Sequence, residues 1–71
     1  MMNMTTVKGR IVKAVGFDDD SHKLYVKLNT GSVYVYEPVP ATIYDDIIST
    51  SSPDTYYNKW INGQYNESRL T

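Results

Sequence analysis

The chain has 71 residues and no cysteine, so it fits one small domain that has no disulfide and no cysteine-based zinc site. Its formal net charge is −1, and its seven basic residues form no run, which argues against a surface for double-stranded DNA. No apolar stretch approaches the roughly 20 residues that span a bilayer, and residues 1–6 lack the features of a signal peptide. We therefore expect a cytoplasmic protein (in the host cytoplasm if the chain is viral) that does not contact membranes.

Three strands are predicted in the first half of the chain. Residues 7–17 are rich in β-branched and aromatic side chains, and residues 18–21 have the composition of a turn. Residues 23–29 alternate between apolar and polar side chains, and residues 32–37 alternate again after a turn that contains Gly31. Short turns join antiparallel neighbours, so this pattern predicts a three-stranded antiparallel meander.

The hairpin between the second and third strands has two possible registers. A two-residue loop at residues 30–31 places Tyr34 and Tyr36 on the same side as Tyr25, opposite the apolar side chains of the second strand. A three-residue loop at residues 29–31, with Gly31 in the left-handed conformation, moves Tyr34 and Tyr36 to the apolar face. The sequence leaves both registers open.

Two short helices are predicted after the sheet. Residues 38–40 end the third strand, because proline has no N–H to donate to a ladder. Apolar residues follow at helical spacing, and a second helix begins at Ser52 and Pro53 and ends at Gly63. The predicted fold class is α+β in the order β-β-β-α-α, a single domain (residues 1–71) with a core at 7–66 and loose ends at 1–6 and 67–71.

The predicted hydrophobic core combines the apolar faces of these strands and helices. In the second helix, Trp60 and Ile61 lie on one stripe with Tyr56 and Tyr57, of which one is expected to face inward and the other outward. The predicted core residues are Val15, Phe17, Leu24, Val26, Leu28, Ile43, Ile47, Trp60 and Ile61.

Catalysis and metal binding find little support in the sequence. His22 is the single histidine and stands in a polar turn without an evident nucleophile to activate. Asp18, Asp20 and His22 have the spacing that begins a calcium loop, but Lys23 and Asn29 occupy the positions that require glycine and glutamate. We therefore expect a binding module and not an enzyme, with no catalytic residue, no metal and no cofactor.

The ordered motifs of the chain resemble the KTSC domain. They are Val15-Gly16-Phe17-Asp18, Tyr34-Val35-Tyr36, Val39-Pro40 and Tyr56-Tyr57-Asn58, and the resemblance covers about residues 9–66. The chain departs from the pattern in lacking a serine before the first strand and in having Pro53-Asp54 where glycine is usual. The family occurs at the C-terminus of some lysyl-tRNA synthetases and as free-standing proteins of bacteria and phages, so the resemblance implies RNA binding by association only.

Seven tyrosines in 71 residues are the unusual feature of this composition. Aromatic side chains on a small sheet can stack nucleobases, each stack being worth roughly 1–3 kcal/mol. The two-residue register predicts a stacking platform with nearby cations; the alternative is that Tyr34 and Tyr36 belong to the core. The predicted ligand-binding residues are Tyr25, Tyr34, Tyr36, Lys23, Lys27, Arg10 and Lys13.

Three functions are compatible with these residues. The first is binding of a small nucleotide, concretely as a phage-type sponge that sequesters a host nucleotide defence signal. The second is an RNA-binding appendage that takes short single-stranded RNA. The third is a protein–protein assembly module that uses a free sheet edge. A sheet with free edges in so small a domain also predicts a homo-oligomer.

Overall fold

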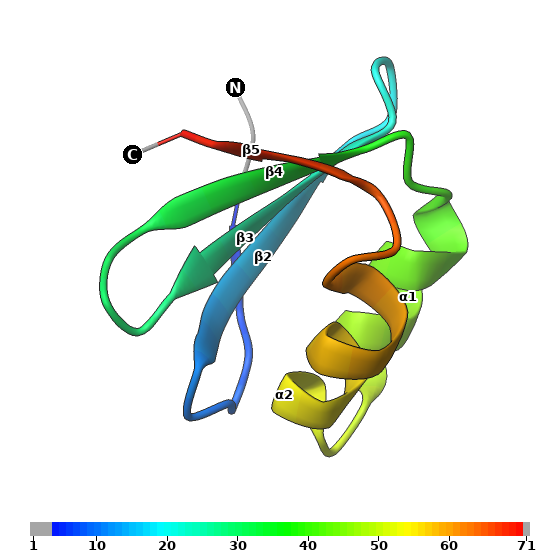
Figure 1. The fold of residues 1–71 in the computed structure, drawn as a ribbon. Coiled ribbons are helices and arrows are strands. Elements are labelled where there is room, and N and C mark those ends of the chain that lie inside the picture. The colour runs from blue at the N-terminus through cyan, green and yellow to red at the C-terminus, as the bar shows by residue number, and fades with distance from the viewer. Residues whose placement is uncertain (1–3, 71) are drawn as a thin grey trace.

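The computed structural model describes residues 4–70, which form an antiparallel sheet with helices on one of its faces (Figure 1). The sheet has five strands in the order β1-β2-β3-β4-β5. None of the helices in residues 4–70 is long and apolar enough to cross a membrane. The elements are β1 (Thr5–Thr6), β2 (Val12–Asp18), β3 (Lys23–Leu28), β4 (Val33–Glu37), α1 (Ala41–Ser49), α2 (Pro53–Tyr56), the π-helix η1 (Tyr57–Ile61) and β5 (Asn66–Arg69).

The α+β class and the three predicted strands, now β2 to β4, are confirmed, but the sheet has a further strand at each edge. The predicted loose ends were wrong in this respect: β1 pairs with β2, and β5 returns after the helices to pair with β4. The two edge strands are short and polar, so ladder hydrogen bonds and not apolar alternation hold them, and periodicity did not reveal them. The predicted ends at 1–3 and 71 lie outside the described residues.

The hairpin between β3 and β4 adopts the three-residue loop. The N–H of Leu28 donates to the carbonyl of Ser32 at 2.9 Å, and the N–H of Gly31 donates to the carbonyl of Leu28 at 3.0 Å. Gly31 has a φ of 93°, in the left-handed region that glycine adopts without a side-chain clash. This one backbone conformation decides which side chains of β4 face the helices.

The three-residue loop places Tyr34 and Tyr36 on the core face of the sheet. Tyr36 pairs with Leu24 and Tyr34 pairs with Val26, and Leu24, Val26 and Tyr36 are completely buried. The stacking platform predicted from the two-residue register is therefore not formed, because Tyr25 lies on the opposite face of the sheet.

Most of the predicted core is found where expected. Phe17, Leu28 and Ile43 remain partly exposed but pack against the buried cluster. Four further residues are buried although they were not among the predicted core residues: Val7, Val12, Val39 and Tyr57. The predicted core residues that are completely buried are Val15, Leu24, Val26, Ile47 and Ile61.

Trp60 was wrongly predicted to be a core residue, since it is 50% exposed. The chain passes from α2 into a π turn, in which the N–H of Asn62 donates to the carbonyl of Tyr57 at 2.8 Å. The wider turn keeps Tyr57 and Ile61 against the sheet and rotates Trp60 into solvent. There the indole lies beside the ring of Tyr56. Of the tyrosine pair, Tyr57 is buried as one of the two was expected to be, but Tyr56 does not face fully outward, because it is partly buried and packs against the core.

Asp54 in α2 joins the helices to the beginning of β2. Its carboxylate accepts the backbone N–H groups of Arg10 at 2.7 Å, Ile11 at 3.1 Å and Val12 at 2.9 Å. A Cβ at Gly9 would lie 2.5 Å from Asp54 Oδ1, so only glycine lets the chain wrap this closely around the carboxylate. Burial alone raises the pKa of Asp54, but the three donors outweigh it and hold the pKa below its usual value.

Alanine substitution at Trp60 and at Ile61, which are neighbours in η1, should lower the free energy of unfolding by very different amounts. Ile61→Ala should lower the free energy of unfolding by about 2–5 kcal/mol, because it opens a cavity in the core. Trp60→Ala should cost less than about 1 kcal/mol, because the ring makes surface contacts only. Urea denaturation followed by circular dichroism measures both, and equal losses would contradict the assigned orientation of η1.

Asp54→Asn should lower the free energy of unfolding at neutral pH by about 1–3 kcal/mol, because the backbone donors lose a charged acceptor. The folded pKa of Asp54 is depressed, so its contribution is present above about pH 4 and is lost as pH falls through the folded pKa. The variant should therefore lose less stability on acidification than the parent does. Urea midpoints between neutral and acidic pH measure this, and Asp45→Asn on α1 is the control. If the stability of the parent and of Asp54→Asn falls in parallel as the pH is lowered, the contact of the Asp54 carboxylate with the N–H groups of residues 10–12 does not contribute as described.

Candidate functional site

The face of the sheet opposite the helices is open in the part of the chain that the structure describes, and we call it the open face. The side chains of the core face pack with Ile47, Tyr57 and Ile61 of the helices, which leaves the alternate residues on the other side. The central strand β3 contributes Lys23, Tyr25 and Lys27 to the open face. Each of these three residues is the middle of a cross-strand row.

The middle row consists of Gly16, Tyr25, Val35 and Ser68. Gly16 and Val35 are buried even though their side of the sheet carries no helix, and Tyr25 between them is partly exposed. Tyr25 thus stands between two small or apolar neighbours, Gly16 and Val35, in the middle row. A partly exposed ring between such neighbours suits stacking of a planar base.

The row on one side of Tyr25 consists of Ala14, Lys27 and Val33, with Thr6 beyond Ala14. Lys27 is exposed, and no member of this row is acidic. Lys13 is also exposed and stands in the bulge of β2 before Ala14, next to the pairing partner of Lys27. Among residues 4–70, this row therefore has a positive charge and no carboxylate of its own.

On the other side of Tyr25, Lys23 pairs with Asp18 of β2 and lies near Glu37 of β4. Lys23 Nζ lies 4.0 Å from Glu37 Oε2, and Asp18 is its direct partner on β2. Hydrogen bonds from the Ser21 side chain and the Asp20 N–H hold the pKa of Asp18 below its usual value, so this carboxylate stays ionised. Two carboxylates compensate Lys23, which makes it a poorer phosphate ligand than Lys27.

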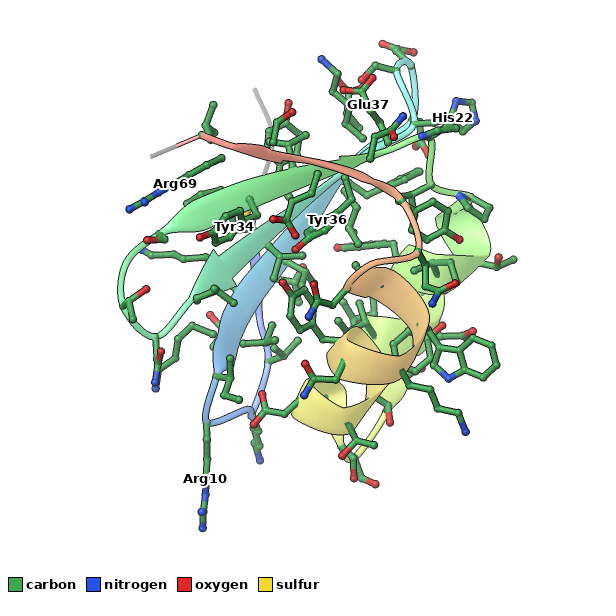
Figure 2. The ribbon with its side chains drawn as sticks, viewed as in Figure 1. Arg10, His22, Tyr34, Tyr36, Glu37 and Arg69 are labelled. Atoms are coloured by element: carbon green, nitrogen blue, oxygen red, sulfur yellow. The ribbon has the colours of Figure 1, made fainter. Side chains whose placement is uncertain are left out.

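Arg10 is separated from the other predicted cations. It is exposed in the loop before β2, and its side chain points away from the sheet (Figure 2). Its backbone N–H is held by Asp54. Of the predicted ligand-binding set, the open face thus gathers Tyr25, Lys23 and Lys27, with Lys13 beside them, whereas Tyr34, Tyr36 and Arg10 lie elsewhere.

Tyr36 takes part in a buried network that the sequence analysis missed. The Tyr57 hydroxyl donates to the Tyr36 hydroxyl, which donates in turn to Glu67 Oε1 at 2.8 Å. Burial is the main reason that the pKa values of Tyr36 and Tyr57 are raised, so both hydroxyls stay protonated at neutral pH. The network joins β4, η1 and β5, and Figure 2 shows Tyr36 on the part of β4 nearer the helices, with Tyr34 nearer the hairpin.

The available sequence signal for this network was the Tyr-x-Tyr motif itself. A tyrosine placed in the core needs a partner for its hydroxyl, and in the three-residue register that partner has to come from outside the meander. Glu67 supplies it from a segment that was predicted to be a loose end. Glu67 becomes a partner of Tyr36 only in the three-residue register, which the sequence left open.

The remaining candidates offer little chemistry. His22, at a φ of 56°, uses its carbonyl to accept the Val39 N–H at 2.9 Å and sets its ring against Phe17. Within residues 4–70, no group of three or more His, Cys, Asp or Glu side chains could hold a metal ion. A shallow depression of about 380 Å³ is lined by Pro38 and residues 63–66, none of which is charged.

The model of the KTSC domain matches residues 10–65, and the chain belongs to this family. A crystal structure of a KTSC domain protein from Yersinia pestis has the same fold, with a TM-score of 0.94 at 20% identity, and the alignment covers 100% of both chains. At this identity the likeness is one of fold alone.

Curated proteins with similar sequences include lysine–tRNA ligases of cyanobacteria. Those of a Nostoc species and of Nostoc punctiforme are 28% and 27% identical over 64 residues, which is 90% of this chain. The chain spans only 11% of the length of these ligases. A protein of Tsukamurella paurometabola is 27% identical over 55 residues, and the match covers 82% of that protein.

Tyr57→Phe should lower the free energy of unfolding by about 1 kcal/mol at neutral pH, because it removes one buried hydrogen bond. The folded pKa values of Tyr36 and Tyr57 are raised, so their contribution is complete below about pH 10 and is lost as pH rises towards the folded values. The variant should lose less stability than the parent between neutral and strongly alkaline pH. Tyr25→Phe on the open face is the control. An unchanged alkaline profile in Tyr57→Phe would contradict the network.

Proposed function

We propose that this KTSC domain is a non-catalytic module that binds a small nucleotide on the open face, with the base on the Tyr25 ring and a phosphate at Lys27. The observation that carries the proposal is the combination of a central, partly exposed tyrosine with a lysine two residues further along the same strand, whose cross-strand neighbours Ala14 and Val33 are not acidic. Residues i and i+2 of a strand lie about 7 Å apart on one face, which is on the scale of a single nucleotide.

The small number of cations favours a ligand with few phosphates. Lys27 and Lys13 are the basic residues at this end of the open face, and the net charge of the chain is −1. Two lysines suffice for one or two phosphates, whereas a long nucleic-acid track requires more. A module that holds a nucleotide without converting it acts by sequestration, and in a phage-encoded copy the ligand would be a host nucleotide defence signal.

RNA binding is the second candidate. The observation that favours it is the similarity to segments of lysine–tRNA ligases. In this version Tyr25 stacks one base of a short single strand, while Lys27 and Lys13 contact neighbouring phosphates.

Tyr25→Ala should weaken nucleotide binding by roughly 5-fold to 150-fold, which corresponds to the loss of one stack. Tyr25→Phe should keep the affinity, because it retains the ring. Lys27→Ala should weaken binding, and Lys23→Ala is its matched control because Lys23 already pairs with Glu37. Calorimetry with mononucleotides, cyclic dinucleotides and short single-stranded RNA measures all four variants.

Salt dependence separates the two candidates. RNA affinity should fall steeply between low and physiological salt, in proportion to the phosphates contacted, while a small nucleotide should show a shallow slope. If no nucleotide or RNA binds at millimolar concentration, or if Tyr25→Ala binds as well as the parent, the open face is not the site.

A further inference from the structure

The β5 strand is the long edge of the sheet. Within residues 4–70 its only neighbour is β4, and all four of its residues are exposed; it runs along the rim of the sheet in Figure 1. The opposite edge, β1, has only two residues. β5 contains no proline, so every one of its residues has a backbone N–H, and those that point outward can donate to another strand. Of the two edges, β5 is the one long enough to do so.

The backbone groups that point outward from β5 are those of Glu67 and Arg69. The N–H of Leu70 donates to the carbonyl of Val33 at 2.7 Å, so Leu70 directs its backbone groups towards β4. Direction alternates along an antiparallel strand, so Ser68 and Asn66 also face β4. Glu67 and Arg69 therefore present their N–H and C=O groups to any incoming strand.

Within its own chain, Glu67 Oε1 accepts from the Tyr36 hydroxyl and Arg69 Nη2 donates to Ser32 Oγ. Neither contact neutralises the charge of Glu67 or Arg69, so the signs of these two charges favour one partner and one register. When β5 pairs antiparallel with β5 of a second copy about a two-fold axis at Ser68, Glu67 lies opposite Arg69 of the second copy, and the reverse contact forms as well. The neighbouring symmetric registers place Glu67 opposite Glu67 or Arg69 opposite Arg69. Opposite charges across a strand pair stabilise it and like charges destabilise it, so one register is preferred.

We propose that the chain forms a two-fold symmetric dimer in which the β5 strands of two copies pair antiparallel about Ser68 and make one continuous sheet. The two-fold axis runs perpendicular to the sheet, so the helices of both copies lie on one side and both open faces lie on the other. This dimer does not depend on the proposed nucleotide site, and either can fail without the other.

Cysteine cross-linking tests the register directly, because the chain has no cysteine of its own. At the axis the two Ser68 Cα atoms lie about 4.5 Å apart, within the range that a disulfide spans. Ser68→Cys should therefore form a covalent dimer under mild oxidation. Asn66→Cys on the same strand is the matched control: its two copies are offset by four residues, about 14 Å, and should not cross-link.

Light scattering of the uncross-linked protein supplies the second measurement. The parent should have twice the mass of one chain. Arg69→Pro removes an outward N–H and no ladder bond to β4, so it should stay folded by circular dichroism and have half the parent's mass. Arg69→Lys, which keeps the charge and the backbone donor, should remain dimeric. A monomeric parent, cross-linking of Asn66→Cys as efficient as that of Ser68→Cys, or a folded dimer of Arg69→Pro would each overturn the proposal.

Discussion

The contact on which this fold depends most is the carboxylate of Asp54 held by consecutive backbone N–H groups of residues 10–12. Without it these donors would stand at the start of β2 with no partner in the sheet, and α2 would have no polar attachment to the strands. The contact needs a residue without a Cβ at position 9, so Gly9 and Asp54, far apart in the sequence, act together. It also fixes where the helices meet the sheet, because α2 and η1 are continuous.

A second constraint follows from the hairpin. The left-handed Gly31 adds a residue to the loop, and this turns Tyr36 into the core. A buried hydroxyl needs hydrogen-bond partners, and Tyr36 finds them in Tyr57 and Glu67. The hydrogen bonds of the buried Tyr36 hydroxyl therefore connect both η1 and β5 to β4. The register set by one loop residue thus adds a side-chain contact to the ladder hydrogen bonds that hold β5 on β4.

These constraints divide the surface into regions with different chemistry. Lys23 and Lys27 lie on the same strand and the same face, yet two carboxylates compensate Lys23 and none stands in the row of Lys27. We propose that this asymmetry directs a phosphate to one side of Tyr25. The long edge, in contrast, has one acidic and one basic residue with outward backbone groups, and that arrangement suits a second copy of the chain better than a phosphate.

The sequence by itself determined the α+β class, the three central strands, the helices and half of the buried core cluster, because these depend on local periodicity and on proline and glycine positions. It also carried the family pattern. Only the tertiary structure decided the hairpin register, the exposure of Trp60 and the two edge strands. Two loop lengths satisfy the same alternation at Tyr34 and Tyr36, and a π turn has no periodic signature that would separate Trp60 from Ile61. The edge strand β5 is polar throughout, so its place in the sheet comes from ladder hydrogen bonds and from the needs of a tyrosine 31 residues away.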